Sequence, residues 1–154
     1  GEHNLVKICE QVLENLHQLI QNKGITIVNH SNFNGQWNFD ADRITQVMTN
    51  VVSNAIKFCP EENGSIEIQM NNLEDGVQIS VSDNGIGVDE HDTKRIFEKF
   101  YQSENQNFKK PIGSGLGLAI CKNIVQLHGG KIWIENNENQ GATVTFTLPK
   151  INEI

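Results

Sequence analysis

Three polar side chains that could hold a metal ion and phosphate recur at helical spacing: Asn50, Asn54 and Lys57. On a helix they form a stripe about 60° wide beside a broad apolar face. Amide oxygens are hard ligands that suit Mg²⁺, and a lysine one turn later can meet phosphate as a point charge. The polar flank of a half-buried helix would show the same spacing, although asparagine is a poor helix former. The stripe by itself leaves both interpretations open.

A carboxylate and two glycines follow an apolar, alternating run in the segment DNGIGV, residues 83–88. Asp83 at a strand end can accept a hydrogen bond from a ligand amine, such as that of adenine. Gly85 and Gly87 would let the backbone approach that ligand closely. Asp-Asn-Gly is also a common turn sequence, so this segment alone indicates either a turn or a base contact.

A second glycine segment, GSGLGL at residues 113–118, opens a helical pattern. Glycines at the start of a helix expose backbone N–H groups and favour a bound anion. The segment matches neither the dinucleotide pattern GxGxxG nor the P-loop GxxxxGK[ST], so a different kind of phosphate site is indicated.

Helices and strands must bring these segments together. The fold class that the pattern predicts is α+β, with a mixed, mainly antiparallel sheet and helices on one face. Residues 102–112 are polar without a core pattern and are expected to form a mobile loop. Helices are predicted over 4–22, 42–58 and 116–127, a short helical piece over 89–101, and strands over 25–29, 35–39, 65–71, 77–83, 131–135 and 143–148.

The composition fits one soluble globular domain. The 154 residues are 37% hydrophobic with a net charge of −7, which argues against disorder and against nucleic-acid binding. Cys9, Cys59 and Cys121 form no CxxC pair and are expected to be buried free thiols in a reducing compartment. No apolar stretch approaches the roughly 20 residues of a membrane span, so a cytoplasmic location is expected, with a parent protein that could be membrane-anchored elsewhere.

Five segments follow one another along the chain: DADRITQVMTNVVSNAIKFCP, VSDNGIGV, IFEKFYQ, GSGLGLAICKNIVQLHGGKIWIEN and GATVTFTLP. In this order they resemble the GHKL superfamily, and within it the catalytic domain of histidine kinases. The resemblance implies a two-layer α/β sandwich of the Bergerat type, with three helices and a flexible ATP lid over residues 102–112. It also implies that residues 1–154 form a single ATP-binding domain, without the dimerisation and phosphoacceptor domain.

The resemblance implies ATP and Mg²⁺ as cofactors and assigns a role to each site residue. Asn54 would be the Mg²⁺ ligand, with Asn50 lining the same site and Lys57 on phosphate. Asp83 would bind the adenine amine, helped by Gly85, Gly87 and, through water, Thr143. Phe58 would wall the pocket, and Phe97, Phe100 and Tyr101 would pack under the lid. The phosphates would accept hydrogen bonds from the backbone N–H groups of Gly113, Gly115, Leu116 and Gly117.

Two positions bear on the reaction. ATP-hydrolysing relatives carry a glutamate where this chain has Asn50, and an amide cannot act as a general base at neutral pH. This favours transfer of the γ-phosphate to a protein. Many histidine kinases have an arginine where this chain has Gln102, so either Lys99, Lys109 or Lys110 supplies that charge or the chain binds the γ-phosphate weakly. Two alternatives stay open: a nucleotide-binding module without kinase activity, and a related protein-serine kinase or ATPase.

The phosphate acceptor is expected outside this chain. None of the five histidines lies in the family's acceptor motif, a His followed by an acidic residue, Leu and Arg-x-Pro. The expected partners are therefore ATP or ADP, the dimerisation and histidine-phosphotransfer domain of the parent kinase and, indirectly, a response regulator. Without the dimerisation element the chain is expected to be a monomer.

Overall fold

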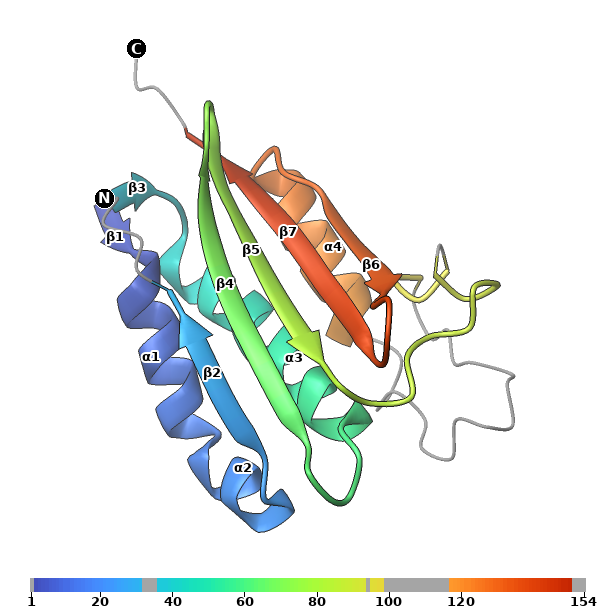
Figure 1. Cartoon of the computed structure of the whole chain (residues 1–154). Helices are drawn as coiled ribbons and strands as arrows, with labels where there is room; N and C mark the ends of the chain where they lie inside the picture. The colour runs from blue at the N-terminus through green and yellow to red at the C-terminus, as the bar shows by residue number, and fades with distance from the viewer. Residues whose placement is uncertain (1, 32–35, 94, 99–116, 151–154) are drawn as a thin grey trace.

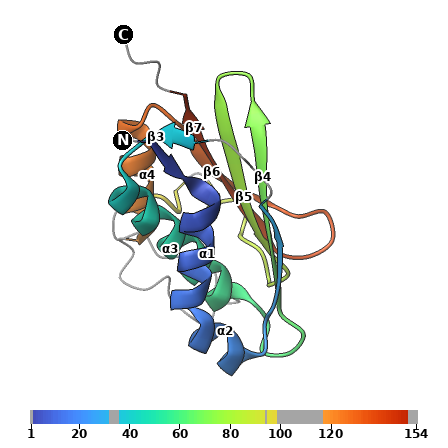
Figure 2. The same ribbon diagram turned by 90° about the vertical axis from the view of Figure 1, so that its left-hand side faces the viewer.

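A computed structural model of the chain describes residues 2–31, 36–93, 95–98 and 117–150. In this part of the chain a twisted five-stranded sheet carries helices on one face, and the other face has no helix over it (Figures 1 and 2). The described helices are α1 (Leu5–Asn15), α2 (His17–Lys23), α3 (Ala41–Phe58) and α4 (Gly117–Leu127).

The main sheet has the strand order β2-β4-β5-β7-β6. Only the β2–β4 pair is parallel among these neighbours, and the other three pairs are antiparallel. The predicted mixed, mainly antiparallel sheet is therefore confirmed. The strands are β2 (Thr26–His30), β4 (Ser65–Leu73), β5 (Gly76–Asp83), β6 (Ile132–Asn136) and β7 (Ala142–Pro149).

Alternation along the strands decides which side chains reach the core. On β5, Val77, Ile79 and Val81 are fully buried under the helices, while Ser80 and Ser82 lie on the helix-free face. Every second residue of a strand lies on the same face of the sheet, and apolar residues three or four apart form one stripe on a helix. The apolar stripe of α3 therefore packs against the apolar face of the sheet. The fully buried residues of the helix include Ile44, Val47, Met48, Val51 and Val52.

The predicted helix over 4–22 is wrong as one piece, because it bends at Leu16 into α1 and α2. Leu16 has φ −97° and ψ 5°, yet its N–H still reaches the Val12 carbonyl at 3.0 Å. Four helices are therefore described where three were expected. The apolar spacing continues through the bend, so the pattern does not reveal it. Contacts of α2 with α3 favour the bend, since the Lys23 ammonium donates to the Ile56 carbonyl at 2.8 Å.

Three shorter predictions are corrected. The expected strand over 35–39 is β3 (Gln36–Asn38), which lies outside the main sheet and pairs with β1 (Glu2–Asn4). The β4–β5 hairpin has a two-residue connection, because pairing continues to Leu73 and Gly76. Described residues from the expected helix over 89–101 form successive turns rather than a regular helix, with the Ile96 N–H 2.9 Å from the Asp92 carbonyl.

The three thiols are buried and free, as predicted. Burial raises the pKa of Cys9 and Cys59 to about 11 and that of Cys121 to about 12, so all three are neutral at physiological pH. Among the described residues, no helix is long and apolar enough to span a bilayer.

Candidate functional site

Helix α3 presents the polar stripe that the sequence predicts. The helix begins after Asp40, whose carboxylate accepts a hydrogen bond from the Arg43 N–H at 3.2 Å and so caps the first turn. Asn54, four turns further on, is only 7% exposed although its side chain is polar. Lys57 is exposed, and no ion pair joins it to another described residue. The end of α3 therefore offers an amide facing inward and a free cation facing solvent.

The Asn54 amide has no hydrogen-bond partner within the described part of the chain. A buried amide usually bonds to protein or water, and one without a partner calls for an explanation. Asn50 differs, because its Nδ2 donates to the Gly117 carbonyl at 3.3 Å. That contact joins α3 to the first turn of α4 and leaves the Asn50 side-chain oxygen available.

Asp83 ends β5 and is the second buried polar group, with 8% of its surface exposed. Its Oδ1 accepts from the Gly85 N–H at 2.8 Å and, less closely, from the Ala142 N–H at 3.4 Å. Oδ2 receives no hydrogen bond from a described residue. Burial raises the pKa of this carboxyl above its ordinary value, and the two N–H groups oppose the rise. The carboxylate is thus fixed on one oxygen and free to accept on the other.

The glycines after Asp83 allow close packing of the loop. A side chain at Gly85 would lie 1.8 Å from the Phe58 carbonyl oxygen, so only glycine fits there. Gly87 has φ +80°, in the left-handed region, and a side chain on it would approach Asn136 Oδ1 to 2.7 Å. Both glycines hold the loop against neighbouring segments, and Gly87 borders the pocket described next.

A narrow pocket lies between the helices and the sheet, where α3 and β5 end. Its empty volume, including the part open to solvent, is about 350 Å³. Its lining is apolar except for Asn54 and Asp83, so polar recognition is concentrated in two side chains. The lining residues are Val51, Asn54, Ala55, Phe58, Val81, Asp83, Gly87, Val88, Leu118, Ile134, Ala142 and Val144.

The structure therefore brings several of the predicted site residues together, namely Asn54, Phe58, Asp83 and Gly87. Gly117 begins α4 beside Asn50, and the nearest atom to a side chain placed there would be Asn50 Cγ at 3.8 Å. Phe97 is buried. The remaining predicted positions lie outside the described residues: Lys99, Phe100, Tyr101, Gln102, Lys109, Lys110, Gly113, Gly115, Leu116 and the expected lid over 102–112.

The expected contact of Thr143 with the base does not fit the structure. Thr143 lies on the helix-free face of the sheet, with Ser82 and Ser80, in a shallow groove on the side opposite the pocket. Its neighbours Ala142 and Val144 line the pocket instead. Successive strand residues point to opposite faces, and the apolar alternation of β7 already carried this information. Ala142 is one of the pocket residues that were not predicted from the sequence, and the others are Val51, Ala55, Val81, Val88, Leu118, Ile134 and Val144.

Comparisons with known proteins show which sequences and structures the chain is similar to. Residues 39–152 match the family model described as histidine kinase-, DNA gyrase B-, and HSP90-like ATPase. The sensor histidine kinase WalK of Bacillus subtilis (strain 168) is 46% identical over 111 residues, which are 71% of this chain and 18% of the relative. The chain thus spans less than a fifth of the length of that curated relative.

Solved structures of similar fold include two of the histidine kinase ThkA. The catalytic domain of ThkA in a nucleotide-free form superposes with a TM-score of 0.84 and 34% identity, covering 97% of each chain. A second structure holds ThkA in complex with the response regulator protein TrrA. It has a TM-score of 0.82 and 32% identity, and the match covers 98% of this chain and 42% of that one.

Proposed function

Because the chain belongs to the histidine kinase-, DNA gyrase B-, and HSP90-like ATPase family, we propose that it binds Mg-ATP and transfers the γ-phosphate to a histidine of a sensor kinase. The observation that carries this proposal is the Asp83 carboxylate at the pocket, with one oxygen held by backbone N–H groups and the other without a partner among the described residues. On this proposal the whole chain, residues 1–154, works as one ATP-binding domain.

Recognition of the base follows from the lining of the pocket. Apolar side chains such as Val81, Leu118 and Val144 suit the faces of a flat aromatic ring. The free oxygen of Asp83 would accept a hydrogen bond from the exocyclic amine of adenine. A base that carries a carbonyl at that position would place two acceptors against each other, which disfavours it.

The donors present fit a magnesium ion. Asn54 is buried without a partner in the described part of the chain, and Asn50 keeps its side-chain oxygen available after donating to Gly117. Neutral amide oxygens can bind Mg²⁺ beside phosphates without adding negative charge. Asn54 would hold the ion with Asn50 beside it, and a bound Mg²⁺ would neutralise charge on the phosphates.

Lys57 would contribute a positive charge at the rim of the site, where it is exposed and unpaired among the described residues. Gly117 opens α4, and its N–H group, with those of Gly113, Gly115 and Leu116, would bind the phosphates. Phe100 and Tyr101 would support a lid formed by residues 102–112. Phosphoryl transfer requires mainly positioning and neutralisation of charge, which are the roles proposed for these groups.

The acceptor histidine would belong to the dimerisation and histidine-phosphotransfer domain of the same sensor protein. Asn50 is an amide and cannot activate water as a base, which favours transfer to a protein over hydrolysis. A response regulator would receive the phosphate from that histidine. The ThkA structure, a histidine kinase in complex with a response regulator, supports a response regulator as a partner. On its own, the chain would be a monomer.

Calorimetric titration with ADP and a non-hydrolysable ATP analogue, with and without Mg²⁺, tests binding. Saturable binding that Asp83→Asn abolishes is expected, and a folded chain that binds neither nucleotide would contradict the proposal. Transfer is tested by adding γ-labelled ATP and a histidine-phosphotransfer domain from a related kinase. The expected product is an acid-labile, base-stable phosphohistidine on that domain. Binding without any transfer would favour a nucleotide-binding module that lacks kinase activity.

A further inference from the structure

Two asparagines contact the segment that runs from Asp83 to Val88. Asn136 is the last residue of β6, and Asn137 follows it directly. Asn136 Oδ1 accepts from the Val88 N–H at 2.7 Å, and its Nδ2 donates to the Val88 carbonyl at 2.6 Å. One side chain thus satisfies both backbone groups of a pocket residue, as a neighbouring strand would. The sequence analysis gave neither asparagine a role.

Asn137 contacts the backbone of Asp83 itself. Its Nδ2 donates to the Asp83 carbonyl at 3.0 Å, and the Gln140 carbonyl lies 3.2 Å from the same nitrogen. Carbonyl oxygens only accept, so these two neighbours fix which end of the amide is nitrogen. The Asn137 side-chain oxygen must then point the other way.

That oxygen faces Thr143. Thr143 Oγ1 lies 2.5 Å from Asn137 Oδ1 and 2.9 Å from Ser82 Oγ, on the helix-free face of the sheet. A hydroxyl carries a single proton and an amide oxygen can only accept, so Thr143 donates to Asn137 at this short distance. Ser82 Oγ also accepts from Asn137 Nδ2 at 2.9 Å. Thr143, Ser82 and Asn137 therefore orient one another.

We propose that Thr143 and Asn137 are positioning residues for the Asp83 carboxylate, and that they act on the pocket from the opposite face of the sheet. A path of hydrogen bonds runs from the Thr143 hydroxyl through the Asn137 amide to the Asp83 carbonyl. Thr143 and Asn137 also bond to the side chain of Ser82, the residue before Asp83. Asn136 fixes the far end of the same loop at Val88. This inference rests on the proposed function, since it concerns how adenine is recognised.

The arrangement gives Thr143 a role that needs no contact with a ligand. If Asp83 is held in place mainly by its two N–H contacts, loss of the Thr143 hydroxyl changes nothing in the pocket. If the path through Asn137 matters, the loss loosens the carboxylate and lowers selectivity for the amine of the base. General weakening of the fold would instead reduce the affinity for all nucleotides alike.

The test compares dissociation constants for ADP and inosine diphosphate, whose base has a carbonyl in place of the adenine amine. Thr143→Val keeps the β-branched shape and removes the hydroxyl. We expect it to narrow the ratio of the two constants by about two- to tenfold, the effect of one hydrogen bond. Thr143→Ser, which keeps the hydroxyl, should have the same ratio of dissociation constants as the unchanged chain. Asn137→Ala should narrow the ratio at least as much as Thr143→Val.

Thr145→Val is the matched control, because Thr145 lies on the same strand and face but has its hydroxyl 3.3 Å from Ser80 rather than near the loop. This variant should keep the ratio of the unchanged chain. An unaltered ratio in Thr143→Val, or an equal change in Thr145→Val, overturns the positioning role while leaving the proposed function intact. If the unchanged chain binds no ADP, both proposals fall.

Discussion

Asp83 is the residue at which the proposed binding role and the stability of the fold make opposite demands. Its carboxyl is 8% exposed and its pKa is raised by burial. A raised carboxyl pKa means that the folded state holds the proton more tightly than the unfolded state does. The contribution of this group to stability is therefore greatest below its unfolded pKa and falls as the pH rises through the folded pKa. The Gly85 and Ala142 N–H groups offset part of the cost of burying the charged form, and on the proposed function a ligand amine would offset more of it.

Asp83→Asn is therefore expected to separate stability from binding. The neutral amide removes the buried charge, so the free energy of unfolding at neutral pH should equal or exceed that of the unchanged chain, while ADP binding is lost. The difference should grow in favour of the variant as the pH rises above about 4, the ordinary pKa of the carboxyl in the unfolded chain. Urea unfolding across that range measures it. A variant that becomes relatively less stable as the pH rises would refute this account.

Asn54→Leu tests the amide without a partner. Leucine has a similar volume and no polar atoms, so the free energy of unfolding should change little or increase. Mg²⁺ should then no longer strengthen ADP binding, as titrations with and without the ion would show. Ser53→Ala, on the preceding residue of α3 and away from the pocket lining, is the control and should keep the full Mg²⁺ effect.

At the scale of elements, α3 is held at both ends. Asp40 caps its first turn, and the Lys23 ammonium of α2 donates to the carbonyls of Ile56 and Lys57 at 2.8 and 3.2 Å. The last carbonyls of a helix lack partners within the helix, and a cation there also suits the helix dipole. The end of α3 that carries Asn54 and Lys57 is thus held by Lys23 of α2.

Lys23→Met should lower the free energy of unfolding by about 1 kcal/mol, since methionine keeps the apolar stem and loses the charged donor. Chemical denaturation measures this change. Lys7→Met removes an exposed lysine from α1 and serves as the matched control, with an expected change within about 0.5 kcal/mol. Equal losses in the two variants would show that the contact with α3 is not the cause.

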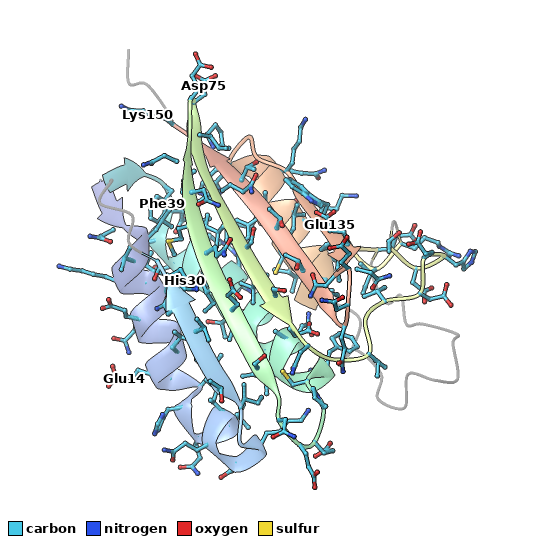
Figure 3. All side chains as sticks on the ribbon, viewed as in Figure 1. Glu14, His30, Phe39, Asp75, Glu135 and Lys150 are labelled. Atoms are coloured by element: carbon cyan, nitrogen blue, oxygen red, sulfur yellow. The ribbon has the colours of Figure 1, made fainter. Side chains whose placement is uncertain are left out.

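At the scale of the whole molecule, the buried hydrophobic residues of the described part of the chain form one core. Asp75 and Lys150 lie at one end of the sheet (Figure 3), where the Lys150 N–H donates to the Asp75 carbonyl at 2.6 Å. The candidate site lies at the other end of β5, where Asp83 follows Asp75 by eight residues. Between the ends, a continuous core joins the sheet to α3 and α4, so the packing around the site belongs to the same cluster of buried side chains as the packing far from it.

Among the described residues, Phe146 is the largest fully buried side chain, and it lies in β7, two residues from the pocket residue Val144. Phe146→Ala should cost about 3–5 kcal/mol, a large part of the stability of a typical domain. Calorimetric or chemical unfolding would measure the loss. Phe146→Leu fills more of the space and should cost clearly less, and equal costs for the two variants would argue against a close-packed core here.

Much of this protein could be predicted from its sequence. The apolar stripe of α3, the alternation of β4 and β5 and the glycine segment after Asp83 are local patterns, and each element forms where its pattern predicts. The positions of Asn54, Asp83 and Gly87 at one pocket followed from the resemblance to a family and agree with the geometry. Periodicity determines which face a residue occupies because it depends only on neighbours along the chain.

Contacts between distant residues were decided by the tertiary structure alone. The bend at Leu16 accompanies the contact of Lys23 in α2 with the end of α3, and the pairing of Asn136 with Val88 joins residues 48 apart in sequence. The role of Thr143 changed for the same reason, because its partners Ser82 and Asn137 come from two other segments. Spacing along the chain specifies the parts and their buried faces. Which polar groups then meet across them depends on how the packed layers align, and no local pattern encodes that alignment.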